Sequence, residues 1–487
     1  MAKVYKIHPG IGIARVGDSE EEFFIGPEIP GRGPVEFGAG GEQPVTSFKD
    51  GSFRVKRQAA RFRIFEYDQD ADGKLANPRE ITAAEAEITW TVELANRKAS
   101  ARESPPPLPT RPLRNPGQQN RARLEITPAP RSVAGRNQQG ASFDDGRFED
   151  EPVYLGELRT DADGRLLVLG GRGRSRSVPA NRPIVNFANN DFWHDDVADG
   201  TVRATVMMSG QAAVEVTQEN SSWVIVAPPD FAPALGGIVT LFDIAQQAAV
   251  ERNWIQPPAT PSFRNHILPI LERAAGLRWV HDWTYWSGIS RDWAALSDPA
   301  APSDAREVAF GLIDNNPLND VRLTPTQKAA MQAWVAGSFI NDFGQVPAPV
   351  SITPDRLDRA PLLASVGAGF FPGIEAGQLT TDESIYSEPM RFNSGILRPG
   401  SLTERMAVPW QADFTACQLD WWPSQRPDIA QINPDDPFPN GEWAAGIHRF
   451  EDMVFNFSRL GYILPKQNTS GDEVFVEQGR DPFFPRS

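Results

Sequence analysis

One short segment concentrates the residues whose types and spacing could support catalysis. Cys417 is the only cysteine of the chain, and Asp413 precedes it by four residues. On a helix these two side chains would share a face, so the carboxylate could accept the thiol proton. A cysteine among the tryptophans of residues 410–422 is also compatible with a structural residue in an aromatic core. The residue types therefore leave two interpretations open, a reactive thiol and a core cysteine.

Other motifs that could support chemistry are incomplete. The G-x-G of residues 10–12 lacks the third glycine of a dinucleotide-binding loop. Asp68–Gly73 resembles the start of an EF-hand loop, but Arg79 occupies the position of the bidentate glutamate, which favours a hairpin turn. The Asn and Asp oxygens of residues 189–200 could hold a cation, but we favour a capped surface loop. A single cysteine excludes a disulfide or a multi-thiolate zinc site, and we expect no metal.

Composition limits the possible partners. The 487 residues carry 63 acidic and 48 basic side chains, a net charge of −15, which argues against a nucleic-acid partner. No apolar run is long enough for a membrane span, and the N-terminus lacks the apolar core of a signal peptide. We therefore expect a protein that is cytoplasmic or exported without a classical signal peptide. Forty of the basic residues are Arg, whose forked ion pairs indicate that much of this charge is structural.

The pattern of elements predicts an α+β fold. Short alternating runs and turn signals predict a β-rich N-terminal region with hairpins and sheets over residues 1–234, with one hairpin turn at 161–164. A helix-rich region over residues 235–487 would carry the cysteine segment. Within it, Thr324-Pro325 is typical of a helix start. The Pro-, Arg- and Asn-rich stretch of about 100–123 indicates a surface loop or linker.

Several segments carry a resemblance to a known family, in collinear order along nearly the whole chain. These segments are Ile7–Gly17, Phe48–Asp50, Lys56–Arg63, Trp90–Asn96, Leu155–Leu158, Asn189–Asp191, Phe370–Glu375 and Met406–Asp413. Together with the cysteine segment, they resemble the LodA/GoxA-type oxidases, the lysine ε-oxidase and glycine oxidase family.

This resemblance implies an amino-acid or primary-amine oxidase that releases ammonia and hydrogen peroxide. In the family the cofactor is cysteine tryptophylquinone, made from the protein's own side chains. Cys417 matches the cofactor cysteine, and Asp413 matches the aspartate needed for cofactor formation. The resemblance also implies a flavoprotein that matures the enzyme, and a homo-oligomer.

The chain departs from the family at the second cofactor residue. The family pattern places the modified tryptophan in a W-x-x-L-G-F segment, and here Phe457 begins the corresponding stretch, Phe457–Tyr462. A phenyl ring cannot become an indole quinone. Trp443 is the best substitute on spacing, although its surroundings do not match the motif and an ordinary loop aromatic is an alternative. Two hypotheses follow: an oxidase with a quinone built on another tryptophan, or a quinone-less relative with altered biosynthetic redox chemistry or a non-catalytic binding role.

Overall fold

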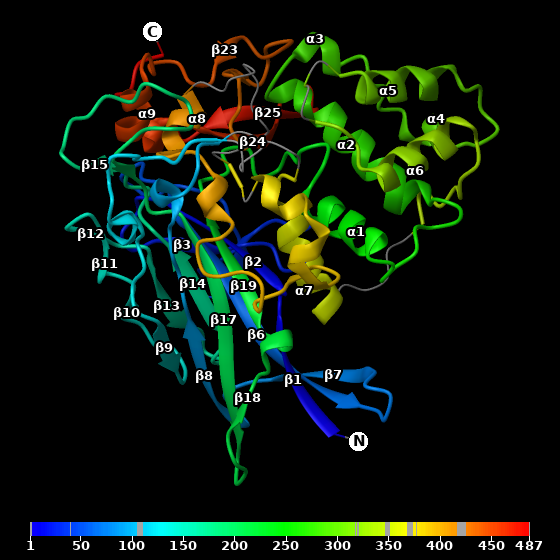
Figure 1. Cartoon of the computed structure of the whole chain (residues 1–487). Helices are drawn as coiled ribbons and strands as arrows, with labels where there is room; N and C mark the ends of the chain where they lie inside the picture. Colours follow the sequence, from blue (N-terminus) through cyan, green and yellow to red (C-terminus); the bar gives the residue numbers. More distant parts are fainter. Residues whose placement is uncertain are drawn as a thin grey trace.

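The computed structural model of the chain describes residues 2–38, 40–104, 111–316, 318, 321–345, 351–367, 374–375, 377–415 and 425–486. A large sheet occupies the N-terminal half, and helices follow from residue 241 onward. Figure 1 shows the sheet on one side, helices α1 to α6 gathered on the other, and the C-terminal elements α8, α9, β24 and β25 above one end of the sheet. The predicted α+β fold is confirmed.

The sheet is mostly antiparallel and is centred on the long strand β6. Its main path runs β10-β13-β14-β6-β2-β19-β17-β8-β9. Two pairs are parallel, β2 with β19 and β3 with β6. The strands of this sheet are β1 (Ala2–His8), β2 (Ile11–Arg15), β3 (Phe23–Ile25), β4 (Val35–Gly38), β5 (Gly41–Pro44), β6 (Arg57–Gln69), β7 (Leu75–Ile81), β8 (Ala86–Val92), β9 (Arg131–Ala134), β10 (Ala141–Ser142), β13 (Gly156–Thr160), β14 (Leu166–Gly170), β17 (Ala198–Met208), β18 (Val214–Glu215) and β19 (Ser222–Ala227).

Both aspartate-rich turns join antiparallel strands. Asp70 lies between β6 and β7, and its Oδ1 accepts hydrogen bonds from the backbone N–H groups of Asp72 (3.0 Å) and Lys74 (2.8 Å). Asp161 does the same between β13 and β14, with Asp163 as one donor. The resemblance of the first turn to an EF-hand is therefore explained by a hairpin, as predicted.

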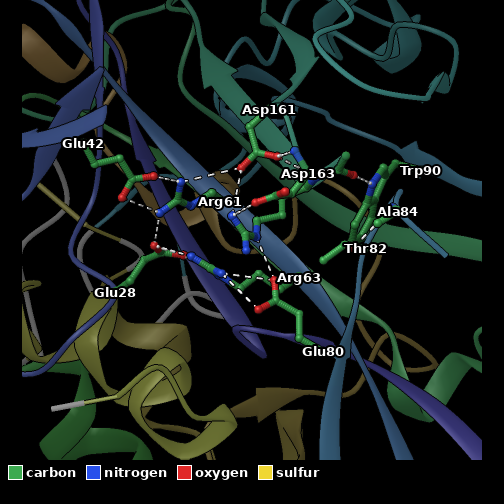
Figure 2. A network of polar contacts seen from close by, with 12 residues as sticks. Glu28, Glu42, Arg61, Arg63, Glu80, Thr82, Ala84, Trp90, Asp161 and Asp163 are labelled. Atoms are coloured by element: carbon green, nitrogen blue, oxygen red, sulfur yellow. Dashed lines mark hydrogen bonds and ion pairs between the residues drawn. The ribbon is translucent and has the colours of Figure 1, made fainter. Parts of the chain in front are cut away.

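Arginines of β6 anchor a network of ion pairs, which Figure 2 shows from close by. Arg61 pairs with Glu28 and Glu42, while Arg63 reaches Glu28 at 2.8 Å and Glu80 at 3.1 Å. Burial opposes ionisation of Glu28, but the two guanidinium groups lower the pKa of this carboxyl to about 2. The network ties β6 to neighbouring strands and loops, which supports a structural role for these arginines.

The helices begin where the sequence places its capping residues. Thr324 and Gln327 form a capping box at the start of α6, as Thr240 and Asp243 do for α1. Within the described ranges, no helix has the length and apolarity needed to span a membrane. The helices are α1 (Leu241–Glu251), α2 (Leu268–Gly276), α3 (Trp283–Trp286), α4 (Trp293–Leu296), α5 (Asp304–Asp314), α6 (Pro325–Val335), α7 (Pro354–Leu363), α8 (Trp410–Thr415) and α9 (Phe450–Asn456). A C-terminal hairpin pairs β24 (Tyr462–Gln467) with β25 (Glu473–Gln478).

The stretch of about 100–123 is only in part the surface loop that its composition predicts. Residues 105–110 lie outside the described residues, but Arg114 and Asn115 are fully buried. The guanidinium of Arg114 donates to the carbonyl oxygens of Lys98 (3.0 Å) and Met406 (2.9 Å). The surface interpretation is wrong for this part, because its side chains satisfy backbone carbonyls in the interior.

Candidate active site

Helix α8 carries Asp413, the carboxylate of the cysteine segment. The side chains from Trp410 to Phe414 are all buried, and Asp413 is 2% exposed. Cys417, like the tryptophans at 421 and 422, lies outside the described residues. Asp413 therefore lies on a helix, which is the condition under which it could share a face with Cys417. Its relation to Cys417 stays a prediction.

The N-terminal end of α8 is held by a buried ion pair from the sheet half of the molecule. Asp195 Oδ2 accepts the backbone N–H of Trp410 (3.0 Å) and the Lys98 ammonium (2.7 Å). Lys98 also donates to the carbonyl oxygen of Ala407 (2.7 Å). Neither side chain of the pair is exposed. A carboxylate at a helix N-terminus is favourable, so this pair fixes where α8 begins.

A glycine-containing loop after β14 fixes the second residue of α8. The Gln411 side chain accepts a hydrogen bond from Ser175 Oγ (2.6 Å) and donates to the carbonyl oxygen of Gly173 (2.9 Å). Gly173 has a φ of +69°, a backbone conformation that residues other than glycine rarely adopt. The helix with Asp413 is therefore positioned on two sides by residues far away in sequence.

Phe457 packs directly against α8 and fills its space. It follows α9 as the first residue of a short 3₁₀ helix and is 5% exposed. Its ring meets the Trp410 ring edge to face, with centroids 5.3 Å apart. A Cβ added at Gly173 would lie 2.5 Å from Phe457 Cζ, so the loop touches the far end of the ring. Gly173 and Trp410 therefore limit the space around the phenyl ring on two sides, where a larger indole would press against them.

Trp443 is a core residue close to the C-terminal end of α8. Its indole is fully buried and donates to the carbonyl oxygen of Gly461 (2.8 Å). The Arg426 guanidinium lies over the ring at 5.3 Å and donates from Nε to the carbonyl oxygen of Phe414 (2.7 Å). Phe231 contacts Trp443 from another side, at 4.9 Å between ring centroids. Trp443 follows β23 in a turn and is buried, so it is an aromatic of a connecting segment that packs into the core.

A second buried polar group lies at the carboxyl ends of the parallel strands β2 and β19. Arg15, the last residue of β2, forms an ion pair with Glu375 at 2.6 Å and donates to the carbonyl oxygen of Pro228 (3.1 Å). Burial raises the pKa of the Glu375 carboxyl to about 7, although the Arg15 charge opposes this shift. Burial also raises the pKa of Asp230, and that of Tyr462 is raised by burial and by the Asp230 charge.

This pairing joins two of the segments that carry the family resemblance, Ile7–Gly17 and Phe370–Glu375. Sequence reasoning assigned Arg15 and Glu375 no role, because the two residues are 360 positions apart. It also missed Lys98 and Asp195. Arg15 and Glu375 could have been singled out because both lie in segments that carry the family resemblance. Lys98 and Asp195 lie outside those segments.

The acidic residues of 189–200 are occupied by protein donors. Asp199 accepts hydrogen bonds from the N–H and hydroxyl of Thr403 (2.8 and 2.7 Å), and Asp196 accepts the N–H of Arg172 (2.6 Å). Burial raises the pKa of Asp196 to about 7 and that of Asp199 to about 6. Most of the segment lies in the interior, so the expected surface loop is wrong. Among the residues that the structure describes, no cluster of three acidic, His or Cys side chains is placed to hold a metal.

Comparisons with known proteins match the chain along most of its length. The family model for the L-lysine ε-oxidase N-terminal part matches residues 8–226, and that for its C-terminal domain matches residues 303–434. L-lysine 6-oxidase from Marinomonas mediterranea is 25% identical, over 98% of this chain and 89% of that protein.

Solved structures show the same fold. The crystal structure of L-Lys ε-oxidase from Marinomonas mediterranea superimposes with a TM-score of 0.78, at 22% identity, covering 98% of this chain and 95% of that one. The structure of its Schiff base intermediate with L-Lys gives the same TM-score and coverage. The sheet, the helical part and the C-terminal elements are therefore arranged as in that enzyme.

Proposed function

Since this chain belongs to the LodA-like family, we propose that it is an oxidoreductase that removes the amino group of an amino acid or other primary amine. Dioxygen would be the electron acceptor, and ammonia and hydrogen peroxide the products. L-lysine is the first substrate to test, because the curated relative is an L-lysine oxidase. The observation that carries the proposal is the likeness over 98% of the chain, together with a buried Asp413 on α8.

The proposed roles of the site residues follow the family pattern. Cys417 would supply the thioether of a protein-derived quinone, and Asp413 would accept a proton during cofactor formation. A maturing flavoprotein and assembly into a homo-oligomer complete the proposal. The family's cysteine tryptophylquinone does not fit at residue 457, where the space between Gly173 and Trp410 holds a phenyl ring.

Trp443 is the tryptophan among the described residues that we propose as the substitute partner. It lies beside the C-terminal end of α8, to which Arg426 and Phe231 connect it. Its indole is already oriented by the hydrogen bond to Gly461.

One observation favours a second candidate function. Phe457, which the family pattern aligns with the cofactor tryptophan, is buried and packed against Trp410, as expected for a relative that works without the quinone. Such a protein would keep the α8 scaffold but perform other redox chemistry or only bind its ligand.

A mass measurement combined with an activity assay separates the two functions. The protein is produced together with the products of its neighbouring genes, and the intact mass and tryptic peptides are measured. A Cys417–Trp443 cross-linked peptide, with peroxide released from L-lysine or another amine, supports the oxidase. An unmodified Cys417 that alkylates freely refutes the quinone. Cys417→Ala is the matched control, because it retains the fold and removes the thiol.

A further inference from the structure

A cavity of about 480 Å³ opens where residues 100–102, 113, 121 and 125 meet residues 398, 404 and 405. Among the described residues that line it, four are arginines and two are glutamates. The charged lining residues are Arg102, Arg121, Arg398, Arg405, Glu125 and Glu404. We call this cavity the arginine pocket. Its volume lies within the range of about 300–1,000 Å³ that small-molecule sites usually have.

The charge of the arginine pocket is opposite to that of the whole chain. Its described lining residues carry four positive and two negative charges, an excess of two positive charges, whereas the protein has a net charge of −15. Glu125 is already engaged by Arg97, which lies outside the lining, and by the Ser100 hydroxyl at 3.1 Å. Glu404 reaches Arg398 only at 3.8 Å. The acidic groups therefore neutralise the arginines incompletely.

The guanidinium groups of the pocket retain unused donors. Arg121 donates to carbonyl oxygens, such as that of Ser100 at 2.8 Å, and Arg102 uses Nη1 for the carbonyl of Arg111. Arg405 forms no hydrogen bond or ion pair with any described residue, and its Nε is buried without an acceptor. A buried donor without an acceptor destabilises the folded state, so an acceptor from a ligand would stabilise the pocket.

We propose that the arginine pocket binds a small multivalent oxyanion that presents phosphate or carboxylate groups. The planar fork of a guanidinium matches the oxygen pairs of these groups, and each contact is a charge-assisted hydrogen bond. A compact anion with two or more charges can satisfy Arg405 and Arg398 from one wall and Arg102 from the other. This site is separate from the proposed amine chemistry and does not depend on it.

Residues of the pocket wall connect directly to the candidate active site. Residues 406–409 link Arg405 to Trp410, the first residue of α8. Arg114 holds this link by donating to the carbonyl oxygens of Glu404 (3.4 Å) and Met406 (2.9 Å). An anion that joins the two walls would therefore also restrain the segment that leads into α8, as expected for a regulatory ligand.

The test measures binding of two probe anions to the full chain by isothermal titration calorimetry. Pyrophosphate represents the phosphate class and citrate the carboxylate class, and NaCl keeps the ionic strength constant. We expect saturable binding of at least one probe. Arg405→Gln and Arg398→Gln should each weaken it at least tenfold, and Arg405→Lys by less, because it keeps the charge but loses the fork. Arg32→Gln is the matched control, since it removes the same charge from an exposed position outside the pocket.

Several outcomes would overturn the proposal. These are equal binding by Arg405→Gln and Arg32→Gln, or no binding beyond the NaCl background. A third is a change of oligomeric state in Arg405→Gln without any anion effect, because the pocket would then be a contact between subunits. If Arg405→Gln fails to fold, the comparison of Arg398→Gln with Arg32→Gln decides the question.

Discussion

Replacing Phe457 by tryptophan tests whether the space around residue 457 holds only a phenyl ring. The ring of Phe457 is confined at its far end by Gly173, where an added Cβ would come within 2.5 Å of Cζ. On another side Trp410 lies edge to face with a centroid distance of 5.3 Å. The second ring of an indole has no space in the present arrangement. We therefore expect Phe457→Trp to destabilise the protein although it restores the family's residue.

The size of the effect follows from two contacts. Overpacking of a well-filled core costs about 1–3 kcal/mol. If the loop shifts to make room, the hydrogen bond from Gln411 to the Gly173 carbonyl (2.9 Å) is lost as well, which adds about 1 kcal/mol. The free energy of unfolding should therefore fall by about 2–4 kcal/mol. Urea denaturation measures this change, and hydrogen exchange of residues 170–176 shows whether the loop opens.

A matched control and a compensating variant sharpen this test. Phe455→Trp makes the same change on α9 at a position that is 74% exposed, so it should alter stability by no more than about 0.5 kcal/mol. Combining Phe457→Trp with Trp410→Phe conserves the summed volume and should recover at least half of the loss. If Phe457→Trp has the same free energy of unfolding as the wild type, and hydrogen exchange of residues 170–176 is unchanged, the claim that the site is limited to a phenyl ring is refuted.

Three further predictions concern the support and chemistry of α8. Asp195→Asn leaves Lys98 buried without a counter-charge and should lower the free energy of unfolding, measured by urea denaturation, by about 3–5 kcal/mol. Adding Lys98→Met should recover part of this loss. A loss below about 1 kcal/mol would contradict the positioning role of the pair. Burial raises the folded-state pKa of Asp196 to about 7 from 3.8, so its contribution to stability is complete below pH 4 and is lost as the pH rises through about 7. The free energy of unfolding should therefore decline over this range, and Asp196→Asn should remove a few kcal/mol of the decline. If the variant's free energy of unfolding falls with the same slope between pH 5 and 8, the prediction is refuted. Asp413→Asn should reduce amine-dependent peroxide release at least about 100-fold with an unchanged circular dichroism spectrum, whereas near-normal release would exclude Asp413 from the chemistry.

Features that depend on neighbouring residues could be predicted from the sequence. The turns at Asp70 and Asp161 and the helix start at Thr324 formed as expected, because a short polar side chain satisfies backbone groups two to four residues away. The β-rich and helix-rich halves followed from the same local patterns.

Features that depend on distant partners could not be predicted. The segment 189–200 looked like a solvated loop because Asp and Asn are usually exposed. Its carboxylates are buried because donors such as Lys98 and Thr403 meet them from positions 97 and 204 residues away. The pair of Arg15 and Glu375 spans 360 residues in the same way. A single sequence does not show which distant side chain will neutralise a buried charge.

These distant contacts also explain how α8 keeps its position in a chain with a phenyl ring at residue 457. The start of α8 is fixed by Asp195 and Lys98, and its second residue by the loop at Gly173, all from the N-terminal half. The side chain at position 457 makes none of these hydrogen bonds, although its ring touches the Gly173 loop. The contacts that position α8 and Asp413 are therefore compatible with a phenyl ring where the family pattern has tryptophan. Whether such a replacement ends the chemistry or moves it to Trp443 depends on residue 417, because only its thiol can make the cross-link.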